Sequence, residues 1–287
     1  MCDDDIHPGL IHDPTVSRRT FGLMTVAMTG VATVARADDK VEEKDVEIKT
    51  PDGVADAALF YPKGKGKWPA VVIWPDVVSL RPAFRDMGRR LASSGYVVLV
   101  PNLYYRVKKA PVVEGGFNFS NPEDRAKLTP MRASVTTEGT FKDAVAYVAF
   151  LDALPQTNKS KKVGVQGYCM GGPLSFRTAG AVPGRIGAVA SFHGGGLITD
   201  KEDSPHLLVP KTTAEYLIEI ADNDDKRNPA EKDKLKAYFA EVKRPAQIEV
   251  FTGADHGWTV KGSQVYNEEA AEKAWSNLLA LYKKTLG

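Results

Sequence analysis

A cysteine lies in the middle of a glycine-rich turn between a strand-like and a helix-like segment. Residues 163–166 (VGVQ) read as a strand, and residues 167–172 (GYCMGG) follow at once. This is the nucleophile elbow G-x-S-x-G with Cys169 in place of serine. The tight turn strains its central residue, and flanking glycines make room for neighbouring backbone. The pattern predicts a Cys169 thiol presented at the end of a strand, where the N-terminus of the following helix favours a thiolate.

A carboxylate and an imidazole follow two later strand-like segments. The acidic residues 222–225 (DNDD) come directly after residues 217–221 (LIEIA), and His256 lies in residues 252–258 (TGADHGW). α/β-Hydrolases carry their catalytic triad in the chain order nucleophile, acid, histidine, each just past a strand. The order therefore predicts acyl transfer by Cys169 with His256 as the base.

Two other histidines of the later chain have less specific patterns. His193 opens residues 193–196 (HGGG), which resemble the oxyanion motif of lipases but come after the nucleophile rather than after an early strand. His206 lies in a proline-containing loop. We interpret the HGGG segment as a loop near the site.

The elements needed to position these side chains alternate along the chain. A hairpin is predicted over residues 45–61, and buried strands over 70–74 and 96–100, because these are short apolar runs bounded by turn residues. Residues 104–130 give no clear assignment. The alternation predicts an α/β fold with a mostly parallel central sheet and helices on both faces. Further strands and helices are expected over 82–94, 138–154, 162–166, 170–178, 186–192, 215–221, 229–242, 246–251 and 266–286.

The first 37 residues have the pattern of an export signal. Arg18 and Arg19 precede the apolar run 21–35, and residues 35–37 (ARA) provide a small-residue cleavage site. We therefore predict a twin-arginine signal peptide over 1–37, a single hydrolase domain over 38–287, and a periplasmic or secreted protein. The twin-arginine export machinery is the implied partner. The alternatives are a chance arginine pair before a buried helix and an uncleaved anchor.

The charge and cysteine content narrow the classes of function. Without residues 1–37 the chain has 35 basic and 32 acidic residues, and no basic cluster carries interleaved aromatic residues, so nucleic-acid binding is not expected. Cys2 lies in the predicted signal, so the mature chain would hold only Cys169 and no internal disulfide. A solitary cysteine is either buried and inert or reactive. A monomer without a metal or organic cofactor is expected.

The sequence resembles the dienelactone hydrolase family, and the resemblance covers nearly all of the chain after the predicted signal. It is carried by residues 167–172 (GYCMGG), 95–98 (GYVV), 101–106 (PNLYYR) and 255–257 (DHG). The resemblance implies the α/β-hydrolase fold and a Cys, Asp, His triad. Matching the end of the strand selects Asp224 as the acid, whereas counting back from Pro229 selects Asp225. We prefer Asp224, because the position at the strand end governs where the side chain points.

The resemblance also implies roles for four further residues. By analogy the backbone N–H groups of Val77 and Met170 form the oxyanion hole. Asp76 stands where family members have a glutamate that interacts with the resting thiol, and Arg106 matches one of two arginines that bind the substrate carboxylate. The second arginine is replaced by Val260, with Lys261 beside it. Losing that bidentate donor argues against dienelactone itself as the substrate.

These residues predict a hydrolase of small esters or lactones that works through a thioester on Cys169. An alternative is a catalytically silent protein that keeps the fold and uses the pocket to bind a ligand. A redox role ranks last, because no second cysteine is available to resolve an oxidised thiol.

Overall fold

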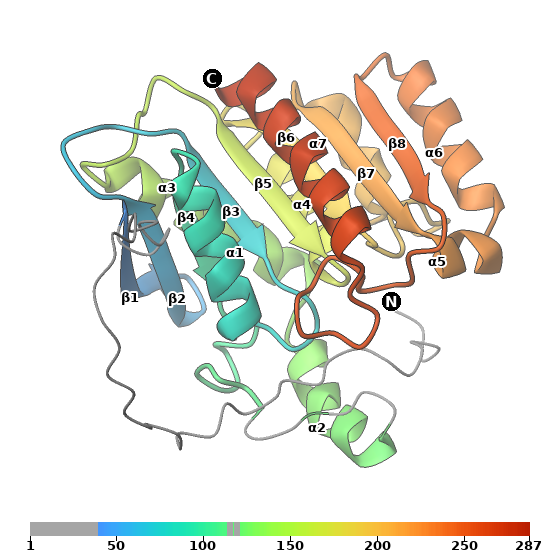
Figure 1. Ribbon diagram of the computed structural model, residues 1–287, viewed down its shortest axis with the longest axis horizontal. Helices are drawn as coiled ribbons and strands as arrows, with labels where there is room; N and C mark the ends of the chain where they lie inside the picture. Colours follow the sequence, from blue (N-terminus) through green and yellow to red (C-terminus); the bar gives the residue numbers. More distant parts are fainter. Residues whose placement is uncertain (1–39, 114–116, 118–120) are drawn as a thin grey trace, which may run out of the picture.

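The computed structural model describes residues 40–113, 117 and 121–287 (Figure 1). The predicted export signal over 1–37 lies outside the described residues. None of the helices within these ranges is both long and apolar enough to span a membrane.

The described residues form one eight-stranded sheet in the order β1-β2-β4-β3-β5-β6-β7-β8. β1 and β2 form the predicted antiparallel hairpin, β2 pairs antiparallel with β4, and the remaining neighbours are parallel. The predicted mostly parallel sheet is therefore confirmed. The strands are β1 (Val41–Thr50), β2 (Gly53–Pro62), β3 (Ala70–Trp74), β4 (Val97–Pro101), β5 (Val163–Tyr168), β6 (Ile186–Phe192), β7 (Glu215–Ala221) and β8 (Ala246–Phe251).

Helices cover both faces of the sheet, as Figure 1 shows. Residues of α1 and α7 pack in one core, and residues of α3, α4 and α6 pack in the core on the opposite face. Both cores consist of buried aliphatic and aromatic side chains, whose removal from water stabilises the fold. The helices are α1 (Pro82–Ser93), α2 (Pro122–Ala133), α3 (Thr137–Ala153), α4 (Gly171–Ala181), α5 (Asp222–Arg227), α6 (Ala230–Glu241) and α7 (Glu268–Leu286).

Three helices of the described residues lie where the sequence predicted none. One is the 3-10 helix η2 (Pro205–Lys211), which contains His206, a residue that was expected in a loop. α2 begins within the unassigned region 104–130, with Asn121 as an N-cap whose side chain accepts from the backbone of Glu123 at 2.9 Å. Its core contact is Leu128, which packs on Val77 and Val78 of the loop after β3. α5 takes up the acidic segment 222–225, for which no helix was expected. Six residues are too few to show helical periodicity in a sequence.

One buried carboxyl group lies inside the sheet. Glu219 of β7 is 1% exposed, and its Oε1 accepts from Asn277 Nδ2 of α7 at 2.9 Å. Its Oε2 is buried and has no hydrogen-bond partner among the described residues. Burial raises the pKa of Glu219 from 4.5 to about 8. The side chain is therefore mostly protonated at neutral pH.

We expect Glu219→Gln to remove a pH-dependent loss of stability. In the wild type the folded state holds the Glu219 proton more tightly than the unfolded state does, because its pKa is raised. The stability that this proton contributes is therefore complete below about pH 4.5 and is lost as the pH rises toward 8. The amide of the variant cannot ionise. The difference in the free energy of unfolding, variant minus wild type, should therefore increase by about 3–5 kcal/mol between pH 5 and pH 9. Urea unfolding at both pH values measures it. The control is Glu241→Gln, at an exposed position of α6. The prediction is contradicted if the stability of Glu219→Gln depends on pH in the same way as that of the wild type.

Candidate active site

Cys169 occupies a left-handed turn between β5 and α4. Its φ is 52°, a conformation that residues with side chains adopt at a cost. A Cβ at Gly167 would collide with the carbonyl oxygen of Gly171, and a Cβ at Gly171 would collide with that of Trp74 at the end of β3. The two glycines therefore allow the backbones of β5, β3 and the first turn of α4 to pack in direct contact. The predicted strand, turn and helix are all present. The expectation of an exposed thiol at the end of the strand is wrong, because Cys169 is buried, with 1% of its surface exposed.

His256 is held by the acidic segment that follows β7. Its Nδ1 lies 2.6 Å from Asp224 Oδ2, and its backbone N–H donates to Asn223 Oδ1 at 2.9 Å. Asp225 instead accepts from Lys232 with both oxygens at 2.8 Å. Asp224 is thus the aspartate paired with His256. With Nδ1 engaged, Nε2 is the ring nitrogen left for proton transfer, and it is buried without a hydrogen-bond partner among the described residues.

His193 connects this imidazole to the cysteine turn. The backbone N–H of Cys169 donates to His193 Nδ1 at 3.2 Å, and the rings of His193 and His256 have centroids 4.8 Å apart. His193 Nε2 lies 2.9 Å from Thr259 Oγ1. The sequence pattern placed His193 near the site, but nothing in it indicated the contact with Cys169 or the involvement of Thr259.

The two predicted oxyanion-hole residues lie against the same tyrosine. Tyr104 Oη donates to the carbonyl oxygen of Val77 at 2.7 Å and lies 4.0 Å from Met170 Sδ. Trp74 and Gly171 pack closely, so the loop after β3 is brought to the start of α4. The fold therefore places the backbone of both residues beside the cysteine turn.

Asp76 is engaged by a cation from the same loop. Its carboxylate accepts from Arg81 Nη1 and Nη2 at 2.7 and 2.8 Å, and from the backbone N–H of Val78 at 3.0 Å. Asp76 is fully buried, and Arg81 is 8% exposed. A carboxylate bound in this bidentate way is held firmly in place, so Arg81 fixes the position of Asp76 in the loop after β3.

Arg106 is also tied into ion pairs. It donates to Asp143 of α3 at 2.8 Å through both Nη1 and Nη2, and to Asp52 at 2.8 Å through Nη2. Its guanidinium thereby joins the turn between β1 and β2 to α3. The expected contact of Arg106 with a substrate carboxylate is not supported by this geometry, because its donors already serve two carboxylates.

A cavity of about 590 Å³ adjoins the residue after the cysteine. Met170 lines it together with residues of α4, the end of α2 and the segment 195–205. Arg177 of α4 also lines it; burial lowers the pKa of this guanidinium, and its nearest carboxylate, Asp203, is 3.6 Å away. The cavity is large enough for a small organic substrate.

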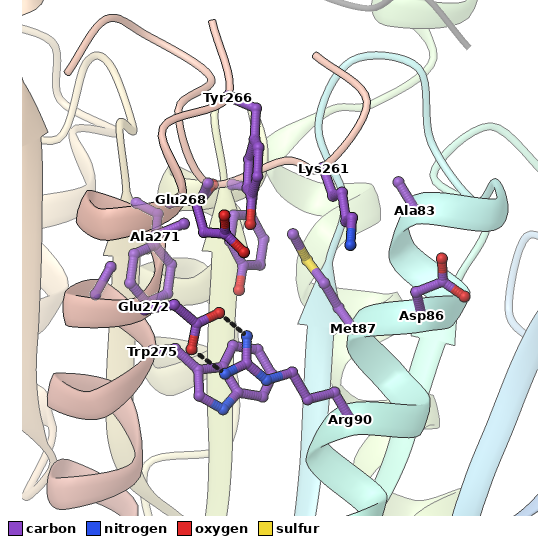
Figure 2. A pocket seen from close by; sticks show the side chains of 14 residues that line it. Ala83, Asp86, Met87, Arg90, Lys261, Tyr266, Glu268, Ala271, Glu272 and Trp275 are labelled. Carbon is purple, nitrogen blue, oxygen red and sulfur yellow. Dashed lines mark hydrogen bonds and ion pairs between the residues drawn. The ribbon is translucent and has the colours of Figure 1, made fainter. Parts of the chain in front are cut away.

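A second cavity, of about 320 Å³, lies between α1 and α7 (Figure 2). Arg90 and Glu272 form an ion pair across it, and the guanidinium stacks on Trp275 at 4.3 Å from the ring centroid. None of the predicted site residues lines this cavity, although Thr259 does. Nowhere in the described ranges do three or more His, Cys, Asp or Glu side chains gather in a way that could hold a metal ion.

The fold and the elbow define an α/β-hydrolase, with the nucleophile position, the histidine and the acid each following a strand of the parallel sheet. The sequence profile of the dienelactone hydrolase family matches residues 55–286. The chain belongs to this family of hydrolases.

Curated relatives agree with this assignment, and a solved structure shares the fold. The chain is 27% identical over 231 residues to a putative carboxymethylenebutenolidase of Synechocystis, an alignment that covers 79% of this chain and 91% of the relative. It is 25% identical to a probable 2-oxo-3-(5-oxofuran-2-ylidene)propanoate lactonase of Bradyrhizobium, covering 82% and 91%. The crystal structure of a putative dienelactone hydrolase from Klebsiella pneumoniae has a TM-score of 0.73 at 21% identity, covering 85% of this chain and 99% of that one.

Gly171→Ala is expected to damage the cysteine turn. Its new methyl group would collide with the carbonyl oxygens of Trp74 and Pro75, which belong to rigid backbone. We expect a loss of about 1–3 kcal/mol in the free energy of unfolding, measured by urea denaturation. Gly195→Ala is the matched control, since its methyl group would meet nothing within 4 Å. Equal stability of the two variants would show that the turn is not tightly packed.

Proposed function

We propose that this protein hydrolyses small carboxylic esters or lactones, with Cys169 as the nucleophile, His256 as the general base and acid, and Asp224 as its partner. The observation that carries the proposal is the 2.6 Å contact between His256 Nδ1 and Asp224 Oδ2. It fixes the tautomer that leaves Nε2 for proton transfer. The contact of His193 with both the His256 ring and the Cys169 backbone supports the placement of this pair beside the turn.

In the proposed reaction His256 Nε2 takes the proton of the Cys169 thiol, and the resulting thiolate attacks the carbonyl carbon. The carbonyl oxygen gains the negative charge and is stabilised by the backbone N–H groups of Met170 and Val77. The C–O bond then breaks, and the departing alkoxide takes a proton from the His256 imidazolium. The products of this half-reaction are an alcohol, or the hydroxyl end of an opened lactone, and a thioester on Cys169.

In the second half-reaction His256 removes a proton from water. The resulting hydroxide attacks the thioester carbonyl, and the C–S bond breaks to give a carboxylic acid and the regenerated thiolate. Asp224 stabilises the imidazolium formed in each half. We place the substrate in the cavity that Met170 lines, next to the cysteine turn.

Twin-arginine export and a monomeric state stay predictions from the sequence. If residues 1–37 direct export, the enzyme meets its substrate in the periplasm or outside the cell.

Hydrolysis of a chromogenic acetate ester tests the proposed roles. We expect Cys169→Ala to remove activity, and Asp224→Asn to lower kcat by about 10²–10⁴-fold because the imidazole loses the partner that fixes its tautomer. Asp225→Asn is the matched control: its carboxylate binds Lys232, so kcat should stay within about threefold of the wild type.

Two results would contradict the assignment. Equal rates for the wild type and Cys169→Ala would favour the alternative, a catalytically silent binding protein. A larger loss in Asp225→Asn than in Asp224→Asn would exchange the roles of the two aspartates.

A further inference from the structure

We propose that His193 and Thr259 act together as a positioning pair, which holds the backbone N–H of Cys169 in one hydrogen-bonded arrangement during acyl transfer. The inference rests on the proposed function, because it assigns a role in the reaction to two residues outside the triad. Both act through the nucleophile and need no contact with the substrate.

The end of β6 holds the Cys169 amide with two acceptors. The N–H donates to the carbonyl oxygen of Phe192 at 3.0 Å and to His193 Nδ1 at 3.2 Å. His193 is itself fixed, since its backbone N–H donates to the carbonyl oxygen of Glu219 at 2.8 Å and its φ is 42°. Behind it, a Cβ at Gly194 would lie only 3.0 Å from Gly172 Cα. The cysteine turn and the start of the HGGG segment thus pack as one unit.

These contacts determine the protonation of His193. A backbone N–H can only donate, so Nδ1 must carry a lone pair, and the proton of the neutral ring must be on Nε2. Nε2 then donates to Thr259 Oγ1 at 2.9 Å. Thr259 therefore holds the ring orientation and the tautomer in which Nδ1 can accept from Cys169.

The surroundings keep His193 uncharged. It is 1% exposed, and burial together with the neighbouring His256 lowers its pKa well below 6.5. The other titratable side chain with a ring contact to it is Tyr168 of β5, with centroids 6.1 Å apart, while β7 contacts it through the backbone of Glu219. A neutral His193 does not oppose the positive charge that His256 gains in the proposed reaction.

Loss of this tautomer would act on the nucleophile directly. A proton on Nδ1 would place one N–H group against that of Cys169, and the contact would become repulsive. The turn is already in a sparsely populated conformation, so it needs surrounding contacts to keep the sulfur in place. The pair should therefore affect kcat and thiol reactivity more than KM.

Substitution of Thr259 tests the pair in the full chain. Thr259→Val keeps the shape and removes the acceptor, whereas Thr259→Ser keeps the hydroxyl. We expect Thr259→Val to lower kcat for the acetate ester about tenfold with KM changed less than about twofold, and Thr259→Ser to stay within about threefold of the wild type. In a Cys2→Ser background, alkylation of Cys169 by iodoacetamide should slow in parallel with kcat. His193→Asn offers an acceptor near the Nδ1 position and tolerates a positive φ, so it should keep more activity than His193→Leu.

The tautomer itself can be observed by ¹⁵N NMR of histidine-labelled protein. We expect His193 to show a neutral ring with the proton on Nε2 between pH 6 and pH 8, and a mixture of tautomers in Thr259→Val. The proposal is overturned if Thr259→Val lowers only the melting temperature, if Thr259→Ser is as impaired as Thr259→Val, or if the proton is found on Nδ1. The alkylation and NMR measurements need no ester, so they judge the positioning pair even if the wild type hydrolyses none.

Discussion

The structure around the site depends on one backbone constraint, the left-handed turn at Cys169. With φ at 52° the chain reverses from β5 into α4 within a few residues. The reversal needs glycines at 167 and 171, because carbonyl oxygens of α4 and β3 occupy the space where their side chains would be. The sulfur consequently lies at the carboxyl end of the parallel strands. The residues that follow β6, β7 and β8 lie at the same end. A parallel sheet with all these strand ends on one side is the arrangement that gathers a nucleophile, a histidine and an acid distant in sequence.

Ion pairs around the site distinguish carboxylates and guanidinium groups that stabilise the fold from the carboxylate that contacts His256. Asp76 is bound to Arg81, Arg106 to Asp143, and Asp225 to Lys232. Removing one partner from a buried pair such as Asp76 and Arg81 leaves an uncompensated charge and costs about 3–5 kcal/mol. Asp224 differs in that its close contact is with His256, while its nearest guanidinium, that of Arg227, is 3.6 Å away. An acid with an imidazole as its main partner can orient that ring and stabilise its charged form.

The sequence predicted the elements whose signals are local. The hairpin, the buried strands and the elbow follow from short apolar runs and glycine spacing. Position relative to the strand end favours Asp224, which contacts His256 in the structure. The ion pair of Arg106 with Asp143 could not be predicted in this way, because Asp143 lies 37 residues away in the sequence on another element. α5 was too short to show periodicity. The contact between His193 and Cys169 joins the ends of two adjacent strands, so its geometry depends on the register of β5 and β6, which no local pattern encodes.

The central claim is that the sulfur of Cys169 takes the acyl group, and trapping that intermediate tests it most directly. The enzyme would be mixed with a chromogenic acetate ester, quenched in acid within the first turnovers, digested and examined by mass spectrometry. The account predicts an acetyl group on the peptide that contains Cys169, removed by hydroxylamine as a thioester should be. Continued hydrolysis with the acetyl group on another residue, or with no acetylated Cys169 at any quench time, would contradict it.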